Sequence, residues 1–155
     1  MIDRVCFTWL CLILFSLISH DGAPVASAQE EGDESIRFEY WELSVDSAET
    51  ALAAWQIEVV DPEGRTEFLA FEGGSHSAFS KPPKYVAKEL VRGKLILAAF
   101  STAKDLPRKK TVVAGLHVQV RGDGDPMYRV RIVAAAGADG NELEASVTLK
   151  KRTNG

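Results

Sequence analysis

The chain has 155 residues, of which 46% are hydrophobic, 8% aromatic and 26% charged, and its formal net charge is −4. These values exclude a collagen-like, low-complexity or highly charged disordered protein. They also argue against a nucleic-acid-binding protein, because neutralising phosphates requires a concentrated basic surface that this chain lacks. A chain of this size can bury about two thirds of its unfolded surface, so it can form a core without disulfides or structural metal ions.

The N-terminal segment has the pattern of a signal peptide. One positive charge precedes an apolar run over residues 5–18, which is shorter than the about 20 residues a membrane-spanning helix needs. Small residues then lead to Ala28, so we expect cleavage before Gln29 and no stable membrane span afterwards; an uncleaved anchor is the alternative. Cys6 and Cys11 both lie in the removed part, which leaves the mature chain without a thiol.

The composition of successive segments divides the chain into four predicted parts. We expect a signal peptide over residues 1–28, a disordered acidic leader over 29–35, a β-sandwich domain over 36–151 and a flexible tail over 152–155. The leader contains no large apolar residue, which is typical of segments that do not pack. The predicted location is therefore exported, either periplasmic or extracellular.

The first strand is predicted from residue 36 onward. Ile36, Phe38 and Tyr40 alternate with polar residues, which is the period of a strand with one buried face. At Trp41 the apolar set moves to the other parity. A shift of one residue predicts a bulge, or a strand that changes its partner sheet, at Tyr40–Trp41.

Two interpretations fit residues 46–54, namely a helix capped by Asp46 or a turn followed by a strand. The alternation of Ala53, Trp55, Ile57 and Val59 with polar residues favours the strand, with Trp55 in the core. Residues 61–64 predict a type I turn, and residues 66–72 are expected to return as the second strand of a hairpin.

Residues 73–93 interrupt the strand pattern, and we call them the 73–93 loop. Pro82 and Pro83 cannot lie inside a sheet, but a short helix over about 83–92, capped by a glycine, fits. Loops this long in compact domains are usually functional or disordered. Its apolar residues favour packing across one edge or end of the sandwich, where it would present His76, Phe79 and Tyr85. A purely structural edge cover is the alternative.

Four more strands are predicted over residues 94–101, 111–121, 127–135 and 142–150. Every proline after residue 28 falls between predicted strands. Seven or more short strands with regular turn signals indicate an all-β, antiparallel sandwich with one short helix in a long loop, rather than alternating β and α units.

Residues 52–149 resemble a known family. The strand AAWQIEV (53–59), the strand GKLILAAFS (93–101), the strand TVVAGLHVQV (111–120) and a final hairpin ADGNELEASVTL (138–149) are similar to the cohesin-like branch of the carbohydrate-binding β-sandwich superfold. The resemblance implies a jelly-roll-like sandwich with a non-catalytic binding or scaffolding role.

The mature chain contains no recognised catalytic motif. His76 and His117 are far apart in the sequence, and no nucleophile elbow is present. His117 alternates with core residues, which indicates a partly exposed histidine on a sheet. The candidate surface aromatics are Trp41, Phe79 and Tyr85, which together with His76 form the predicted binding residues.

Asp123 and Asp125 lie on a glycine-rich turn and are weak candidates for calcium ligands. The turn lacks the twelve-residue calcium pattern, and turn formation alone explains these residues. The same stretch contains Arg121-Gly122-Asp123, a three-residue match to integrin ligands that is common by chance. No metal or cofactor is predicted.

The predicted function is an exported, non-catalytic β-sandwich that mediates protein–protein binding or scaffolding in the cell envelope or extracellular space. One alternative is a carbohydrate-binding module, whose partner would be a polysaccharide. The second alternative is a small hydrolase that uses a pair of carboxylates.

Overall fold

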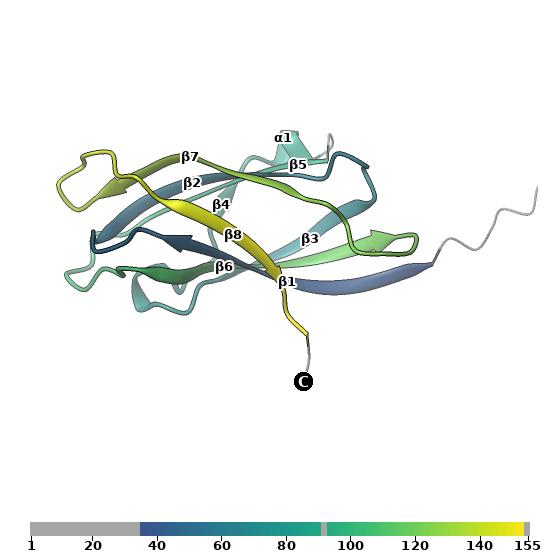
Figure 1. Cartoon of the computed structure of the whole chain (residues 1–155), viewed down its shortest axis with the longest axis horizontal. Coiled ribbons are helices and arrows are strands. Elements are labelled where there is room, and N and C mark those ends of the chain that lie inside the picture. Colours follow the sequence, from purple (N-terminus) through teal and green to yellow (C-terminus); the bar gives the residue numbers. More distant parts are fainter. Residues whose placement is uncertain (1–34, 91–92, 154–155) are drawn as a thin grey trace, which may run out of the picture. The chain divides into compact units, whose positions relative to one another are not determined.

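The computed structural model describes residues 35–90 and 93–153 (Figure 1). The predicted signal peptide, and the predicted leader as far as residue 34, lie outside these residues. Among the described residues, no helix is long and apolar enough to cross a membrane.

Within these described ranges, eight strands form two four-stranded antiparallel sheets (Figure 1). The first sheet has the order β3 (Thr66–Gly73), β6 (Lys110–Arg121), β1 (Ile36–Asp46) and β8 (Ser146–Lys151). The second has the order β4 (Lys84–Tyr85), β5 (Lys94–Phe100), β2 (Leu52–Val60) and β7 (Arg129–Gly137). The predicted antiparallel β-sandwich is confirmed.

The core consists of the side chains that the two sheets turn toward each other. Its fully buried members include Leu43, Leu52, Ile57, Leu95, Leu97 and Leu116. Burying each such side chain stabilises the fold by about 1.5–3 kcal/mol. Trp55 is 2% exposed, which confirms the prediction that it lies in the core.

The predicted face of β1 is wrong over its first half. Glu39, Trp41, Leu43 and Val45 all point inward, so one parity runs through the strand, while Ile36 and Phe38 are exposed. The predicted irregularity at Tyr40–Trp41 is also wrong, since the pairing with β6 shifts between Leu43 and Ser44. The cause is Glu39, a buried carboxylate that a count of apolar residues assigns to the solvent side.

The predicted hairpin of residues 53–72 is wrong, although the strand chosen for residues 53–59 is confirmed. β2 belongs to the second sheet and β3 to the first, so the turn between them carries the chain across the sandwich. The Asp61 carboxylate accepts the backbone N–H groups of Glu63 and Thr66, at 3.0 and 2.7 Å, and this fixes the crossing. Gly64 adopts a φ of 68°, a value that favours glycine.

The last predicted hairpin is reduced to a single bridge. Ala136 on β7 pairs with Glu142, after which the chain crosses to the first sheet and β8 begins only at Ser146. Alternation identifies which face of a strand is buried but not which strand lies beside it. The sequence pattern therefore could not predict that the β2–β3 and β7–β8 connections cross between the sheets.

The 73–93 loop contains a 3-10 turn (Ser77–Phe79), the short strand β4 and helix α1 (Ala87–Leu90). The helix begins later than predicted, at Ala87, because Lys84 and Tyr85 pair with β5 at the sheet edge; residues 91–92 lie outside the described residues. Packing of this loop across a sheet edge therefore agrees with expectation. Its start requires glycine: a Cβ at Gly74 would lie 2.1 Å from the backbone oxygen of Val112.

Candidate functional site

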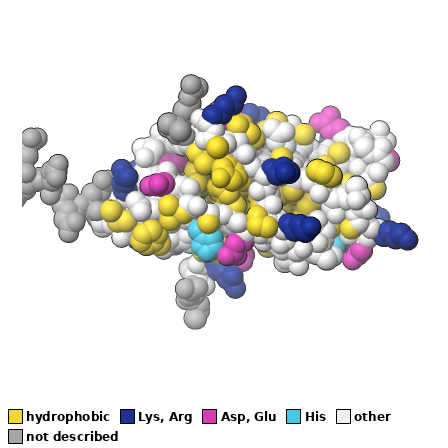
Figure 2. Space-filling model, turned by 180° about the vertical axis from the view of Figure 1, so that it is seen from behind, with side chains coloured by type: hydrophobic (Ala, Val, Ile, Leu, Met, Phe, Trp, Pro, Cys, Tyr) yellow, Lys and Arg dark blue, Asp and Glu magenta, His cyan; other side chains and the backbone are white. Residues whose placement is uncertain are grey.

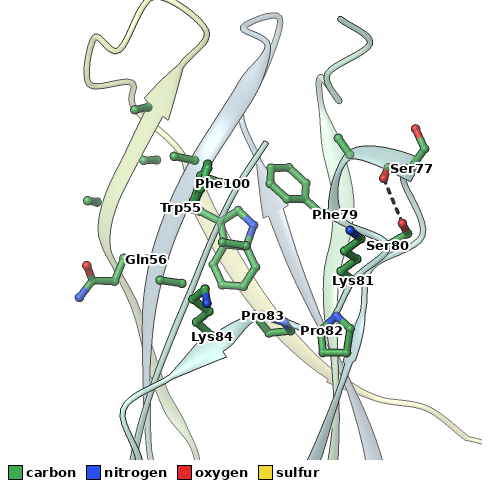
Figure 3. A pocket seen from close by; sticks show the side chains of 17 residues that line it. Trp55, Gln56, Ser77, Phe79, Ser80, Lys81, Pro82, Pro83, Lys84 and Phe100 are labelled. Carbon is green, nitrogen blue, oxygen red and sulfur yellow. Dashed lines mark hydrogen bonds between the residues drawn. The ribbon is translucent and has the colours of Figure 1, made fainter. Parts of the chain in front are cut away.

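A cavity of about 550 Å³ lies between the 73–93 loop and the second sheet (Figure 3). We call it the loop pocket. The loop contributes Ser77–Lys84, and the sheet contributes Ala54–Gln56 of β2, Ala98–Phe100 of β5 and Ala134–Ala136 of β7. Its size and its predominantly apolar lining are typical of ligand-binding pockets.

Short side chains on three adjacent strands create this hollow. Ala54 pairs with Phe100 on one side and with Ala136 on the other, and Gln56 pairs in the same way with Ala98 and Ala134. Ala99 and Ala135, which pair with Trp55, also line the pocket, and because alanine projects little from a sheet these strands leave space at this end. Phe100 is 73% exposed and leaves a large apolar surface at the margin.

Two aromatic rings meet within the lining. Trp55 and Phe79 form an edge-to-face contact with centroids 6.2 Å apart, and Figure 3 shows the rings side by side. The indole Nε1–H of Trp55 is buried and has no acceptor among the described residues. A buried donor left without a partner costs about 1–3 kcal/mol, so this group needs an explanation.

The charge of the lining is entirely positive. It contains Lys81 and Lys84 but no Asp or Glu. Both lysines are exposed, and neither takes part in an ion pair within the described part of the chain. The face opposite to that of Figure 1 carries exposed hydrophobic side chains with Lys and Arg as well as Asp and Glu side chains among them (Figure 2).

The prediction that Trp41 and Phe79 lie on the surface is wrong. Phe79 is 2% exposed, because the 3-10 turn directs its ring onto Trp55. Trp41 is 8% exposed, because it shares the inward parity of Leu43. Phe79 still lines the loop pocket, whereas Trp41 does not.

His76 and Tyr85 remain accessible. The His76 ring caps the 3-10 turn, since its Nδ1 accepts the backbone N–H of Ala78 at 3.2 Å. Its Nε2 lies 3.7 Å from an Asp105 carboxylate oxygen. Tyr85 is 50% exposed, and its ring packs on Phe71 of β3 with centroids 4.9 Å apart. The structure thus brings His76 next to the loop pocket, while Tyr85 closes the gap between two sheet edges.

The turn with Asp123 and Asp125 is occupied by the protein's own cations. Arg37 and Arg65 donate to its backbone carbonyls, and Lys151 Nζ lies 2.7 Å from the Asp125 carboxylate. The hydrogen bond from Lys151 lowers the pKa of Asp125. Among the described residues, no group of three or more His, Cys, Asp or Glu side chains could hold a metal ion. Calcium at this turn would compete with three positive side chains.

A buried polar cluster surrounds Glu39, and the sequence pattern missed it. The Glu39 side chain is 2% exposed and accepts from Trp41 Nε1 at 2.9 Å, Arg37 Nε at 2.6 Å and Lys151 Nζ at 2.7 Å. Burial alone would raise the pKa of Glu39, but the hydrogen bonds from Lys151, Arg37 and Trp41 outweigh it and lower the pKa. This cluster is structural, since it fixes one region of the core.

A second polar cluster lies on the outer face of the first sheet. Glu72 accepts from the Tyr40 hydroxyl at 3.2 Å and lies 2.8 Å from His117 Nε2. The hydrogen bonds from His117 and Tyr40 lower the pKa of Glu72. Arg152, in the predicted tail, places its guanidinium over the Tyr40 ring. His117 is partly exposed on β6, as its alternation predicts.

No protein-family model matches the chain, and no curated protein sequence matches it. Among solved structures, it is similar to a chain of Coh-OlpA-Doc918, a type I cohesin–dockerin complex from Clostridium thermocellum, with a TM-score of 0.54 and 13% sequence identity. The match covers 70% of this chain and 82% of that one. The resemblance found in the sequence is therefore confirmed for the fold: the described domain is a cohesin-like β-sandwich.

Proposed function

We propose that this chain is an exported, non-catalytic interaction domain that binds a protein partner of the cell envelope or extracellular space through the loop pocket. The observation that carries the proposal is the alanine-floored hollow between the 73–93 loop and three strands, with Phe100 exposed at its margin. The fold also supports a protein-binding function, because the similar solved structure is a cohesin–dockerin complex.

A polysaccharide is the weaker alternative. A sugar platform needs exposed, coplanar aromatic rings, but Trp41 and Phe79 are buried, and Tyr85 is tilted by 54° against Phe71. Phe100 is exposed but has no second aromatic ring stacked beside it in the described chain. A protein partner, which needs an apolar pocket rather than parallel rings, fits this surface better.

The pocket also lacks the groups of a carboxylate-dependent hydrolase. Such an enzyme needs two acidic side chains at the reacting bond, and the loop pocket is lined by none. This favours binding over catalysis at the site.

Export is part of the proposal and has its own test. Mass spectrometry of the protein released by its host should find an N-terminus at, or within two residues of, Gln29. Membrane-bound protein that retains Met1 would contradict cleavage.

The binding site is tested by covalent capture from the envelope and culture fluid of the host, with the exported chain carrying a C-terminal tag. We expect a specific partner for the unmodified chain and loss of that partner in Ala98→Arg, which fills the pocket. Gln119→Arg, on the outer face of the first sheet, is the matched control and should capture normally. Equal capture by both variants, or no partner for any form, would overturn the proposal.

A further inference from the structure

Three features of the loop pocket go beyond a general protein-binding role, and together they describe the segment that it accepts. They are the unpartnered Trp55 N–H, the two free lysines and an open strand edge. The inference drawn from them rests on the proposed function and concerns the chemistry of the partner at that same site.

Within the described part of the chain, the Trp55 indole is a donor without an acceptor. Its nitrogen is buried, lies among the pocket-lining residues and faces the part of the pocket that contains Phe79 and Lys81 (Figure 3). The other tryptophan of the described chain, Trp41, is also buried but donates to Glu39. Trp55 Nε1 is closed to solvent, so an occupant can supply its acceptor only by displacing the side chains that cover it.

The lysines define the charge of that occupant. Lys81 and Lys84 flank the pocket from the loop side, and no carboxylate of the lining neutralises them. Complementary charges at an interface steer association and favour the matching partner over others. The occupant should therefore carry carboxylates beside its apolar part.

The unpaired edge of β5 indicates the conformation of the occupant. β4 pairs with β5 only through Lys84–Ala98 and Tyr85–Leu97. Pro82 and Pro83 precede β4 and have no backbone N–H to extend this pairing. β5 continues to Phe100, and since the register places Pro83 and Pro82 opposite its last two residues, these have no strand partner on the β4 side among the described residues. An extended peptide can lie along such an edge and place alternate side chains into a pocket.

We propose that the loop pocket binds an extended, acidic segment of a protein partner. One apolar side chain of this segment inserts beside Trp55 and Phe79, one of its main-chain carbonyl oxygens accepts the Trp55 Nε1–H, and its carboxylates face Lys81 and Lys84. The pocket volume accommodates one large apolar side chain with its flanking backbone.

The test uses the exported chain, labelled with ¹⁵N, and three capped eight-residue peptides. The first has a central phenylalanine flanked by aspartates, the second has lysines in place of the aspartates, and the third has serine in place of the phenylalanine. With the first peptide, we expect the Trp55 indole N–H resonance to move downfield while that of Trp41 stays in place. The second and third peptides should leave both resonances unchanged.

Two variants make the result quantitative. Lys81→Glu combined with Lys84→Glu changes only exposed side chains and should weaken binding of the first peptide by about tenfold. Trp55→Phe keeps a ring of similar position but removes the donor, and it should weaken binding by about fivefold. Unchanged affinity in both variants, or equal binding of all three peptides, would overturn the inference.

The captured partner separates the two proposals. If the partner is lost in Ala98→Arg but binds the double lysine variant and Trp55→Phe as it binds the unmodified chain, the pocket binds protein but the acidic-segment inference fails. If the first peptide binds as described and no partner is captured, the pocket accepts an acidic, apolar segment, but the protein-binding role fails and with it the assignment of that segment to a protein partner.

Discussion

The two buried tryptophans lie in regions of opposite character. Around Trp41 the polar groups are paired: its indole donates to Glu39, and the nearby Tyr128 hydroxyl lies 3.0 Å from the Thr66 hydroxyl. Burial raises the pKa of Tyr128 to about 12, so this hydroxyl keeps its proton. Around Trp55 the indole has no acceptor, and the neighbouring strands carry alanines.

This difference separates stability from binding. A paired polar cluster in a core stabilises one arrangement, and changing any member leaves a buried group unsatisfied. An unpaired buried donor instead destabilises the free domain, because its desolvation is not compensated by a hydrogen bond. The Trp41 region therefore maintains the fold, whereas the Trp55 region is incomplete until an occupant supplies the acceptor.

Removing the charge of Glu39 should have the largest effect. Glu39→Gln leaves Lys151 and Arg37 beside an uncharged amide, and we expect a loss of about 3 kcal/mol in the free energy of unfolding at pH 7. Urea denaturation measures this. Glu42→Gln, on the other face of the same strand, is the matched control and should lose less than about 0.5 kcal/mol. Similar losses in both variants would show that the buried cluster is not what stabilises this region.

The contribution of Glu39 should depend on pH. Its pKa in the folded state lies below the ordinary value of 4.5, so its stabilisation is complete above that value and is lost as the pH falls through the folded pKa. We therefore expect the stability difference between the unmodified chain and Glu39→Gln to be constant from neutral pH down to about 5 and to shrink below it. A difference that persists unchanged in strong acid would contradict the pKa direction.

Trp41→Phe should have an intermediate effect. The ring contact with Tyr128 survives, since centroids 5.0 Å apart suit a phenyl ring as well, but Glu39 loses one of its donors. We expect a loss of about 1–2 kcal/mol in unfolding free energy. No loss at all would mean that this hydrogen bond contributes nothing to the fold.

The cap formed by His76 should matter less. His76→Ala removes the acceptor of the Ala78 N–H, so the turn that positions Phe79 loosens, and we expect a loss of about 0.5–1 kcal/mol. Ser75→Ala, one residue earlier and exposed, is the control. Hydrogen exchange at Ala78 should accelerate only in the histidine variant; equal exchange in both would remove the capping role.

The sequence predicted the sandwich because alternating apolar residues and punctuating prolines are local signals. It failed where a local signal misleads: Glu39 reads as a solvent-facing residue, although three donors allow it to be buried. It failed again at the two sheet crossings, because alternation carries no information on strand neighbours.

The candidate site was located only in part. The length of the 73–93 loop pointed to the segment that borders the loop pocket, where His76 caps the turn and Phe79 lines the cavity. The floor was missed, since the alanines of β2, β5 and β7 come together only in the folded sheet. The runs of consecutive alanines in three predicted strands, at 53–54, 98–99 and 134–136, are the signal that could have found it.

The most direct test compares Trp55→Phe with Trp41→Phe in the same urea denaturation series. Because the Trp55 N–H has no acceptor among the described residues, replacing it removes an unsatisfied donor, which offsets the packing lost with the smaller ring, and we predict a net change within about 0.5 kcal/mol of zero. Trp41→Phe should lose about 1–2 kcal/mol under the same conditions. Equal losses in the two variants would show that the Trp55 N–H is already satisfied in the free domain and would contradict the claim that it awaits a ligand.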